Sequence, residues 1–577
     1  MESPRTAKSP HTHTETSAAR VQHRSTAAEA GAGAIRGQLE VLARLLLLAI
    51  AVTLWFSLLE QRALWDPDEG RYAEIAREMV ASGDWITPRL NDLLYFEKPP
   101  LQYWTTAAAY TLFGAQNWSA RLWSALTGLA GVLFLVYAGR RLHSLRAGIV
   151  AGAMLASSTL YFGLAHLNTL DMGLAFFGEI SVFALALGLR SATQDETRRW
   201  ILLAWCAAAL AVLSKGLIGI LLPTVTLFAY SILHRDFSIW KRLSPVAGGA
   251  LFLLISAPWF IAVMHHNPDF AQFFFVHEHF TRFLTTEHHR AQPLWFFLPV
   301  LALGALPWSF PIALGLWQAC TKRRASAAFD PTRFLVVWVA VVFTFFSASG
   351  SKLVPYILPV FPALAFLGAR YLGSIAKHKV ARCLFWSGIV SAALLVAVAY
   401  VLASRVGSDG VAQVTTACLA AALTCALGAV LARAVAHRGA VEAATIALAV
   451  PIMLAFQITL YAGESLPGRS TLPLAQQIKP HLGDSTRIYA LGMYPQSLPF
   501  YLERTVTLAG FRGELDFGLT REPEKGIAGL DEFIERWARE RDAIAVMSKT
   551  LYGELSARGV QMQLIGADPA SVAVRRP

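Results

Sequence analysis

Two short polar motifs lie between the first and second long apolar segments of this 577-residue chain. The first reads W-D-P-D-E-G-R-Y at 65–72, and the second reads F-E-K-P-P at 96–100. Carboxylates and cations that gather just outside a bilayer, in a chain otherwise built to sit in lipid, are suited to a polar reaction at the membrane surface. The rest of the chain must position these two motifs.

The first motif predicts the start of a helix. Asp66 before Pro67 is typical of a helix N-cap followed by proline at the first helical position, and Glu69 completes a pattern like a capping box. Asp66 and Glu69 therefore have a structural interpretation beside a chemical one. Asp68 is not required by this pattern.

Asp68, Arg71 and Tyr72 are spaced i, i+3 and i+4 on the predicted helix. This spacing places a carboxylate, a guanidinium and a phenol on one helix face. Asp68 is therefore the carboxylate of this motif with the least structural explanation, and a plain surface ion pair to Arg71 is the structural alternative to a chemical role.

The second motif begins another helical stretch, whose aromatic residues suit a helix lying in the membrane interface. Lys98 at its start would lie near the depth of lipid phosphates. Binding of a substrate phosphate and snorkelling to the lipid headgroups are both open to this lysine.

Further polar residues fall at the same predicted side of the membrane. Asp171 lies near one end of an apolar run, where an unpaired carboxylate would be costly. Lys215 lies in a tight turn between two runs, and Lys352 and Tyr356 are one helical turn apart at the end of another. Glu97 with His277 or His279 could supply zinc ligands, because imidazole and carboxylate suit that ion, but the sequence defines no third or fourth ligand.

The composition indicates a polytopic membrane protein. The chain is 55% hydrophobic and only 15% charged, with a mean hydropathy of +0.46. About thirteen apolar runs are near the length needed to cross a bilayer. They lie at about 39–60, 118–139, 147–165, 172–190, 200–213, 216–233, 245–264, 294–317, 334–349, 353–373, 382–403, 412–436 and 441–462.

Lysine and arginine gather in every second gap between these runs, as in Arg140, Arg141 and Arg146 after the second one. Cytoplasmic loops carry such an excess. The pattern predicts a cytoplasmic N-terminus, an external polar site and an external C-terminal region. It also explains the net charge of +12 better than nucleic-acid binding does.

Three domains are predicted. Residues 1–37 are rich in Ser, Thr, Ala and His and are expected to form a disordered cytoplasmic tail. Residues 38–465 form the membrane domain. Residues 466–577 are expected to form a small external α/β domain, with strand-like runs at 487–492, 505–508, 543–547 and 562–565 and a helical pattern at 530–541. The five cysteines offer no disulfide framework for the external parts.

The motifs together resemble the lipid-dependent glycosyltransferases of the GT-C fold, which include protein O-mannosyltransferases, and within them the ArnT-type aminoarabinose transferases. The resemblance starts near residue 41. It rests on D-P-D-E-G-R-Y-A-E-I-A at 66–76, F-E-K-P-P-L-Q-Y-W at 96–104, T-L-D-M at 169–172, L-S-K-G at 213–216, H-E-H-F-T-R-F at 277–283 and S-K-L-V-P-Y-I-L-P at 351–359.

The resemblance implies transfer of 4-amino-4-deoxy-L-arabinose from undecaprenyl phosphate to lipid A phosphates at the periplasmic face of the bacterial inner membrane. Cleavage of a sugar–phosphate bond needs fixed cations for the leaving phosphate and carboxylates for the positive sugar centre. Asp68 and then Asp171 are the expected carboxylates. The donor is expected to contact Arg71, Tyr72, Lys98, Arg282, Lys352 and Tyr356.

Two other functions remain open from the sequence. A protein glycosyltransferase of the O-mannosyltransferase kind would keep the same phosphate-binding residues. A transporter of lipid-linked sugars would also have many spans, but the chain lacks visible repeats and concentrates charge at one face rather than at the midplane. No cofactor is required by the expected reaction, and a divalent cation such as zinc would be an accessory.

Overall fold

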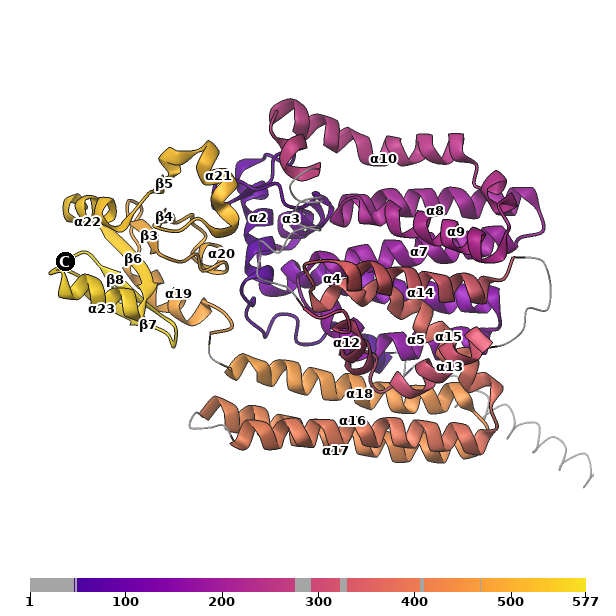
Figure 1. Cartoon of the computed structure of the whole chain (residues 1–577). Coiled ribbons are helices and arrows are strands. Elements are labelled where there is room, and N and C mark those ends of the chain that lie inside the picture. Colours follow the sequence, from indigo (N-terminus) through magenta and orange to yellow (C-terminus); the bar gives the residue numbers. More distant parts are fainter. Residues whose placement is uncertain (1–45, 47–48, 276–291, 322–328, 405–408, 467) are drawn as a thin grey trace, which may run out of the picture. The chain divides into compact units, whose positions relative to one another are not determined.

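The computed structural model describes residues 46, 49–275, 292–321, 329–404, 409–466 and 468–577 (Figure 1). Residues 1–56 form one unit and residues 57–577 form another. The described part of the first unit is a short helical stretch at 49–56. The expected tail at 1–37 lies outside the described residues, and every element below belongs to the second unit.

Nine helical segments in the described part of the chain are long and apolar enough to cross a membrane. They are α4 (Asn117–Leu142), α7 (Leu170–Arg190), α8 (Gln194–Lys215), α10 (Pro245–His266), α14 (Pro331–Ala348), the 3-10 turn η3 (Val354–Val360) continuing into α15 (Phe361–Ser374), α16 (Lys377–Ser404), α17 (Asp409–His437) and α18 (Val441–Ala462). Helices α16, α17 and α18 run alongside one another (Figure 1). The multi-span helical architecture is confirmed.

Two of the expected spans are bent pairs of helices rather than straight ones. Helices α5 (Leu145–Ala156) and α6 (Thr159–Ala165) meet at 67°, and α12 (Phe297–Gly304) and α13 (Ser309–Thr321) meet at 116°. At the first break the hydroxyls of Ser157 and Ser158 donate to carbonyls of their own helix, a bond that bends helices. The second break contains Pro307, which cannot continue the hydrogen-bond ladder.

The number of spans stays a prediction. Each bent pair, counted as one span, brings the nine to at most eleven within the described residues. Helix α9 (Ile218–His234) is apolar but shorter, and residues 39–45 and 47–48 of the first expected span lie outside the described residues.

Two helices and a small hairpin separate the first two expected spans. Helix α2 (Asp68–Ser82) leads to strands β1 (Arg89–Leu90) and β2 (Leu93–Leu94), and α3 (Leu101–Phe113) follows the two prolines of the second motif. Both helices were expected from the motifs. Proline at the end of a loop suits a helix that starts directly after it.

The C-terminal region folds as an α/β domain around a six-stranded sheet in the order β5-β4-β3-β6-β8-β7. Its strands are β3 (Arg487–Leu491), β4 (Thr507–Ala509), β5 (Gly526–Ile527), β6 (Ala543–Ser548), β7 (Gln563–Ala567) and β8 (Ser571–Arg575). The first four lie parallel, and β8 pairs antiparallel with both β6 and β7. The four expected strands are present, whereas β5 and β8 were missed.

Helices cover the two faces of this sheet. Helices α22 (Leu530–Arg539) and α23 (Lys549–Ala557) cover one face, with Phe533, Trp537 and Leu555 in a shared core. Helices α19 (Leu472–Ile478) and α20 (Leu498–Leu502) lie on the other, and α21 (Asp516–Arg521) precedes β5.

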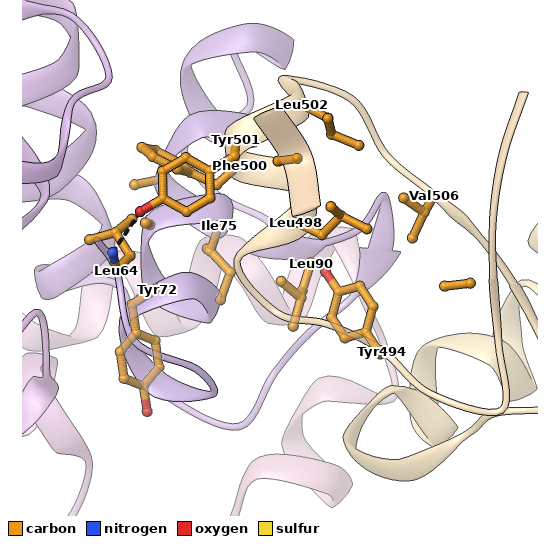
Figure 2. Close-up of a cluster of buried hydrophobic side chains, with 14 of the residues drawn as sticks. Leu64, Tyr72, Ile75, Leu90, Tyr494, Leu498, Phe500, Tyr501, Leu502 and Val506 are labelled. Carbon is orange, nitrogen blue, oxygen red and sulfur yellow. Dashed lines mark hydrogen bonds between the residues drawn. The ribbon is translucent and has the colours of Figure 1, made fainter. Parts of the chain in front are cut away.

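The second face of the sheet shares its core with the helix that carries the first motif. Figure 2 shows Tyr72 and Ile75 of α2 and Leu90 of the hairpin in one buried cluster with Leu498 and Val506. The phenol oxygen of Tyr501 accepts the backbone N–H of Leu64 at 2.6 Å, and its hydroxyl donates to the side-chain oxygen of Asn117 at 3.0 Å. The α/β domain therefore braces α2 directly.

Candidate active site

Asp66 binds the α/β domain instead of capping α2. Its carboxylate accepts the backbone N–H of Ser497 at 2.7 Å and the Ser497 hydroxyl at 3.1 Å. The residue at the N-cap is Pro67, and no side chain caps this end of the helix. The N-cap expectation was therefore wrong, because a partner distant in the sequence takes the carboxylate. Burial raises the pKa of Asp66 to about 7 against these hydrogen bonds.

Glu69 anchors α2 to the membrane helices. Its carboxylate forms a two-pronged pair with Arg121 of α4, at 2.7 Å and 2.9 Å. It also accepts the backbone N–H of Asn168 at 2.9 Å and of Trp65 at 3.1 Å. Burial by itself would raise the pKa of Glu69, but the charge and hydrogen bonds of Arg121 outweigh burial and lower it. The expected capping box is thus replaced by a bond to the N–H of Trp65.

The expected pair on α2 is present, one residue away from this anchor. A guanidinium nitrogen of Arg71 lies 3.6 Å from the Asp68 carboxylate and another lies 3.5 Å from Glu514 of the α/β domain. The side chain of Asp68 is 51% exposed, whereas that of Arg71 is 10% exposed. The buried Nε of Arg71 has no hydrogen-bond partner among the described residues.

Negative and phenolic groups surround Arg71. Burial would lower its pKa, but Tyr95, Tyr72, Glu97 and Asp68 together raise it well above its usual value. The guanidinium is therefore charged at every physiological pH and retains donors for a further anion. Tyr72 is buried, with its ring 6.0 Å from that of Tyr103.

Glu97 and Lys98 lie in the turn before α3 and are both half-buried. The Lys98 ammonium donates to the Glu97 carbonyl at 2.7 Å. The two motifs lie close together, because the helices that follow them, α2 and α3, pack against each other.

A second charged cluster lies at the start of α7. Asp171 in the first turn forms an ion pair with Lys215, at the last residue of α8. The Lys215 ammonium also lies over the ring of Tyr356, 4.7 Å from its centre. Asp171 thus has the partner that its place in the membrane requires, and Tyr356 shares this cluster.

Lys352 is nearby in sequence but has different neighbours. Its buried ammonium donates to the carbonyls of Ser349 at 2.6 Å and Gln292 at 2.9 Å. An ammonium has three donors, so one remains for another acceptor.

Asn168 connects the two charged clusters. Its N–H binds Glu69, which follows Asp68, and its side-chain oxygen accepts from Gln102 of α3 at 2.8 Å. Asp171 follows Asn168 by three residues. The starts of α2, α3 and α7 are therefore joined by hydrogen bonds, which brings Asp68 and Asp171 to one end of the helix bundle.

The chain is similar to a solved protein over nearly its whole length. A crystal structure of ArnT from Cupriavidus metallidurans bound to undecaprenyl phosphate matches with 36% identity and a TM-score of 0.86. The match covers 92% of this chain and 98% of that one. The chain belongs to the ArnT family.

Family models and named relatives agree with the ArnT assignment. The aminoarabinose transferase C-terminal domain matches residues 474–576, and the dolichyl-phosphate-mannose-protein mannosyltransferase model matches residues 40–274. The arabinosyl transferase 1 of Sodalis glossinidius, named for undecaprenyl phosphate-alpha-4-amino-4-deoxy-L-arabinose, is 37% identical over 54% of this chain and 56% of its own length. Its counterpart in Aeromonas salmonicida is 35% identical over 56% of this chain and 58% of its own length. The chain spans little more than half the length of these relatives.

Two expected site residues of this ArnT-family chain, Arg282 and His277, lie outside the described residues. Within the described ranges no group of three or more metal-binding side chains gathers. The zinc site with Glu97 and His277 thus stays a prediction.

Two features of the candidate site were not predicted from the sequence. Lys215 in the L-S-K-G motif was noticed but was not paired with Asp171. Glu69 was given a local role, although Arg121 lies only a few residues inside the next apolar run. A buried arginine at the start of a membrane span requires a carboxylate, and this requirement was the available signal for a distant partner, although several carboxylates of the preceding loop could have met it.

Proposed function

We propose that the chain is a glycosyltransferase that moves 4-amino-4-deoxy-L-arabinose from undecaprenyl phosphate to a phosphate of lipid A. The main support is the half-exposed Asp68 beside the buried, partly unpaired Arg71, in a chain that matches ArnT over 98% of that protein's length. Lipid-linked donor and lipid acceptor would both reach the site from the membrane.

In this reaction a phosphate oxygen of lipid A forms a bond to C1 of the sugar. The bond from C1 to the donor phosphate breaks, and undecaprenyl phosphate leaves with the electron pair. Arg71 and Lys98 stabilise the leaving phosphate, because fixed cations in a dry site act where charge develops. Arg282, Lys352 and Tyr356 are proposed to assist them.

Asp68 and Asp171 have different tasks in this mechanism. Asp68 faces solvent and stabilises the positive charge at C1 or holds the amino group of the sugar. Asp171 holds Lys215 and Tyr356 in position for the donor phosphate. The acceptor phosphate is anionic at neutral pH and needs no general base.

We also propose the orientation that the cationic loops predict, with the site and the α/β domain in the periplasm. The alternation of Lys and Arg between spans supports it. A cysteine substituted for Asp516 should then react with a membrane-impermeant maleimide in intact spheroplasts. Reaction only after lysis would show the opposite orientation, with the α/β domain in the cytoplasm.

The decisive experiment is mass analysis of lipid A from cells that make the donor, with and without the chain. An added aminopentose that depends on the chain and on Asp68 supports the proposal. Unmodified lipid A in the presence of well-expressed protein would reject it.

A protein glycosyltransferase is the second candidate, because the mannosyltransferase model matches residues 40–274. It predicts unmodified lipid A and new glycopeptides in the periplasmic fraction. Peptide mass spectrometry of the same cells distinguishes the two functions.

A further inference from the structure

A long apolar groove runs along α16, away from the catalytic residues. One cavity of about 480 Å³ lies between the break of α12–α13, the end of α15 and the first half of α16. A second cavity of about 420 Å³ lies along the second half of α16 and against α18, and the two share Leu306 and Pro307 as lining residues. Both volumes are within the range of small-molecule sites.

The first cavity has cations at one end and apolar walls beyond them. Lys379 and Arg382 of α16 line it beside Tyr371, and Trp386, Val390 and Phe310 continue it. Trp386 is 56% exposed and Val390 is 48% exposed, so these side chains are open to the bilayer. No carboxylate of the described residues forms an ion pair with Lys379 or Arg382.

The cations lie at the end of the bundle opposite the charged site. Helix α15 begins after Tyr356 and runs to Ser374, and Lys379 follows at the start of α16. The donor phosphate that reacts near Asp68 therefore cannot be the anion at Lys379 and Arg382. By the charge pattern of the loops this end is cytoplasmic.

The dimensions of the first cavity fit one lipid chain. From Lys379 to Val390 the helix rises roughly 17 Å at about 1.5 Å per residue. One leaflet of the hydrocarbon core is about 15 Å thick. The second cavity extends the apolar path, and its hydroxyls at Ser391 and Thr459 are already bonded to carbonyls of their own helices.

We infer that this groove is a specific site for an anionic phospholipid. The phosphate lies against Lys379 and Arg382, and one acyl chain follows Trp386 and Val390 toward the second cavity. Basic pockets between membrane helices on the cytoplasmic side have the charge and depth that such headgroups require.

Native mass spectrometry of the full chain in detergent tests the headgroup contact. Phosphatidylglycerol and phosphatidylcholine with the same acyl chains are titrated separately. Wild-type protein is expected to bind phosphatidylglycerol roughly 30-fold more tightly than phosphatidylcholine, because each of two basic residues near the surface contributes about 1 kcal/mol. Lys379→Gln with Arg382→Gln is expected to bring the two affinities within about threefold of each other.

The matched control is Arg140→Gln with Arg438→Gln, which removes the same charge from exposed positions at the same predicted side. It should retain the preference for phosphatidylglycerol. If the control loses the preference for phosphatidylglycerol equally, the attraction is a general one to the charged surface and the proposed site is overturned. The site is also overturned if the variant with Lys379→Gln and Arg382→Gln keeps the preference unchanged. Displacement of the lipid by millimolar inorganic phosphate alone would overturn a lipid as the occupant.

A second pair of variants tests the apolar path. Val390→Trp fills the first cavity, whereas Val396→Trp adds the same bulk to an exposed position of α16 outside both cavities. Val390→Trp is expected to lower the affinity for both lipids at least about fivefold, and Val396→Trp is expected to leave both affinities unchanged. Unchanged binding with Val390→Trp would reject the groove. Monodisperse elution and an unchanged unfolding temperature show that each variant is folded.

Discussion

Two neighbouring carboxylates of α2, Asp68 and Glu69, form ion pairs that differ in length, in exposure and in hydrogen bonding. The pair of Glu69 and Arg121 has side chains that are 3% and 0% exposed, with direct contact at 2.7 Å. The pair of Asp68 and Arg71 is longer, at 3.6 Å, and its carboxylate is half exposed. In the first pair backbone N–H and carbonyl groups complete the hydrogen bonding, and in the second they do not.

The comparison distinguishes a charged pair that is fully satisfied within the protein from one that can still bind a ligand. A buried pair whose donors and acceptors are all used has no group left to bind a ligand. Loss of one partner of such a pair lowers the free energy of unfolding. A pair with an exposed carboxylate and an unpaired N–H can accept new partners at little structural cost. Of two neighbouring carboxylates on one helix, Glu69 can therefore hold the fold while Asp68 remains open to a ligand.

The largest expected effect is on activity, at the open pair. Asp68→Asn should lower the rate of aminoarabinose transfer on the order of 100- to 10,000-fold, because the charge at C1 loses its carboxylate. The rate is measured with purified protein, donor lipid and lipid A. The unfolding temperature of the Asp68→Asn variant should equal that of the wild type.

The control for Asp68→Asn is Asp516→Asn, which removes an exposed carboxylate paired with Arg512 in the α/β domain. It should change neither activity nor stability. Near-normal transfer by Asp68→Asn would remove Asp68 from the catalytic machinery.

The next effect is on stability, at the closed pair. Arg121→Met leaves the Glu69 carboxylate buried without its cation, which should cost about 3–5 kcal/mol. Chemical denaturation in detergent measures this loss. The additional change Glu69→Gln should recover part of it, and a single variant as stable as wild type would contradict the anchoring role of Arg121.

The pair of Asp171 and Lys215 is intermediate, with side chains that are 13% and 11% exposed. Lys215→Met should destabilise the protein by about 2 kcal/mol, less than a fully buried pair because solvent screens it partly. Adding Asp171→Asn should restore stability but not transfer. Recovery of transfer in the double variant would give the pair a purely structural role.

A further effect is a dependence of stability on pH at Asp66. Its pKa is about 7 in the folded protein and about 3.8 when exposed, so the folded state retains a proton that the unfolded state loses between these values. Stability should fall as pH rises from about 4 to about 7, by at most about 1.4 kcal/mol per pH unit for one group.

Comparison with Asp66→Asn isolates this contribution, because Glu78 is also buried, next to Glu74, and its pKa is also raised. The difference in unfolding free energy between wild type and Asp66→Asn should be constant above pH 7 and change below it. A difference that is constant from pH 4 to 7 would show that Asp66 is already ionised.

Local patterns predicted much of the fold. Apolar runs gave the membrane helices, and the alternation of residues gave four of the six strands of the α/β domain. Strands β5 and β8 were missed for different reasons. Strand β5 has only two residues and so gives almost no pattern. Strand β8 follows β7 across a turn at Asp568 and Pro569, where the Asp568 carboxylate accepts the N–H groups of Ala570 and Ser571, and this turn signal was overlooked.

The site was predicted less completely, because its contacts join residues far apart in the chain. The spacing of Asp68 and Arg71 is local, and that pair was found. The partners of Asp66, Glu69 and Asp171 lie 431, 52 and 44 residues away, and no helical or strand period encodes such distances.

The bond between Asp66 and Ser497 has a consequence for synthesis in the cell. These residues are 431 positions apart. At roughly 5–20 residues per second, the ribosome needs about 20–90 s to make the second after the first. During that interval α2 emerges with Tyr72 and Ile75 lacking the surface they finally cover. The nascent chain therefore carries the motif at 66–72 without its brace until translation is nearly complete.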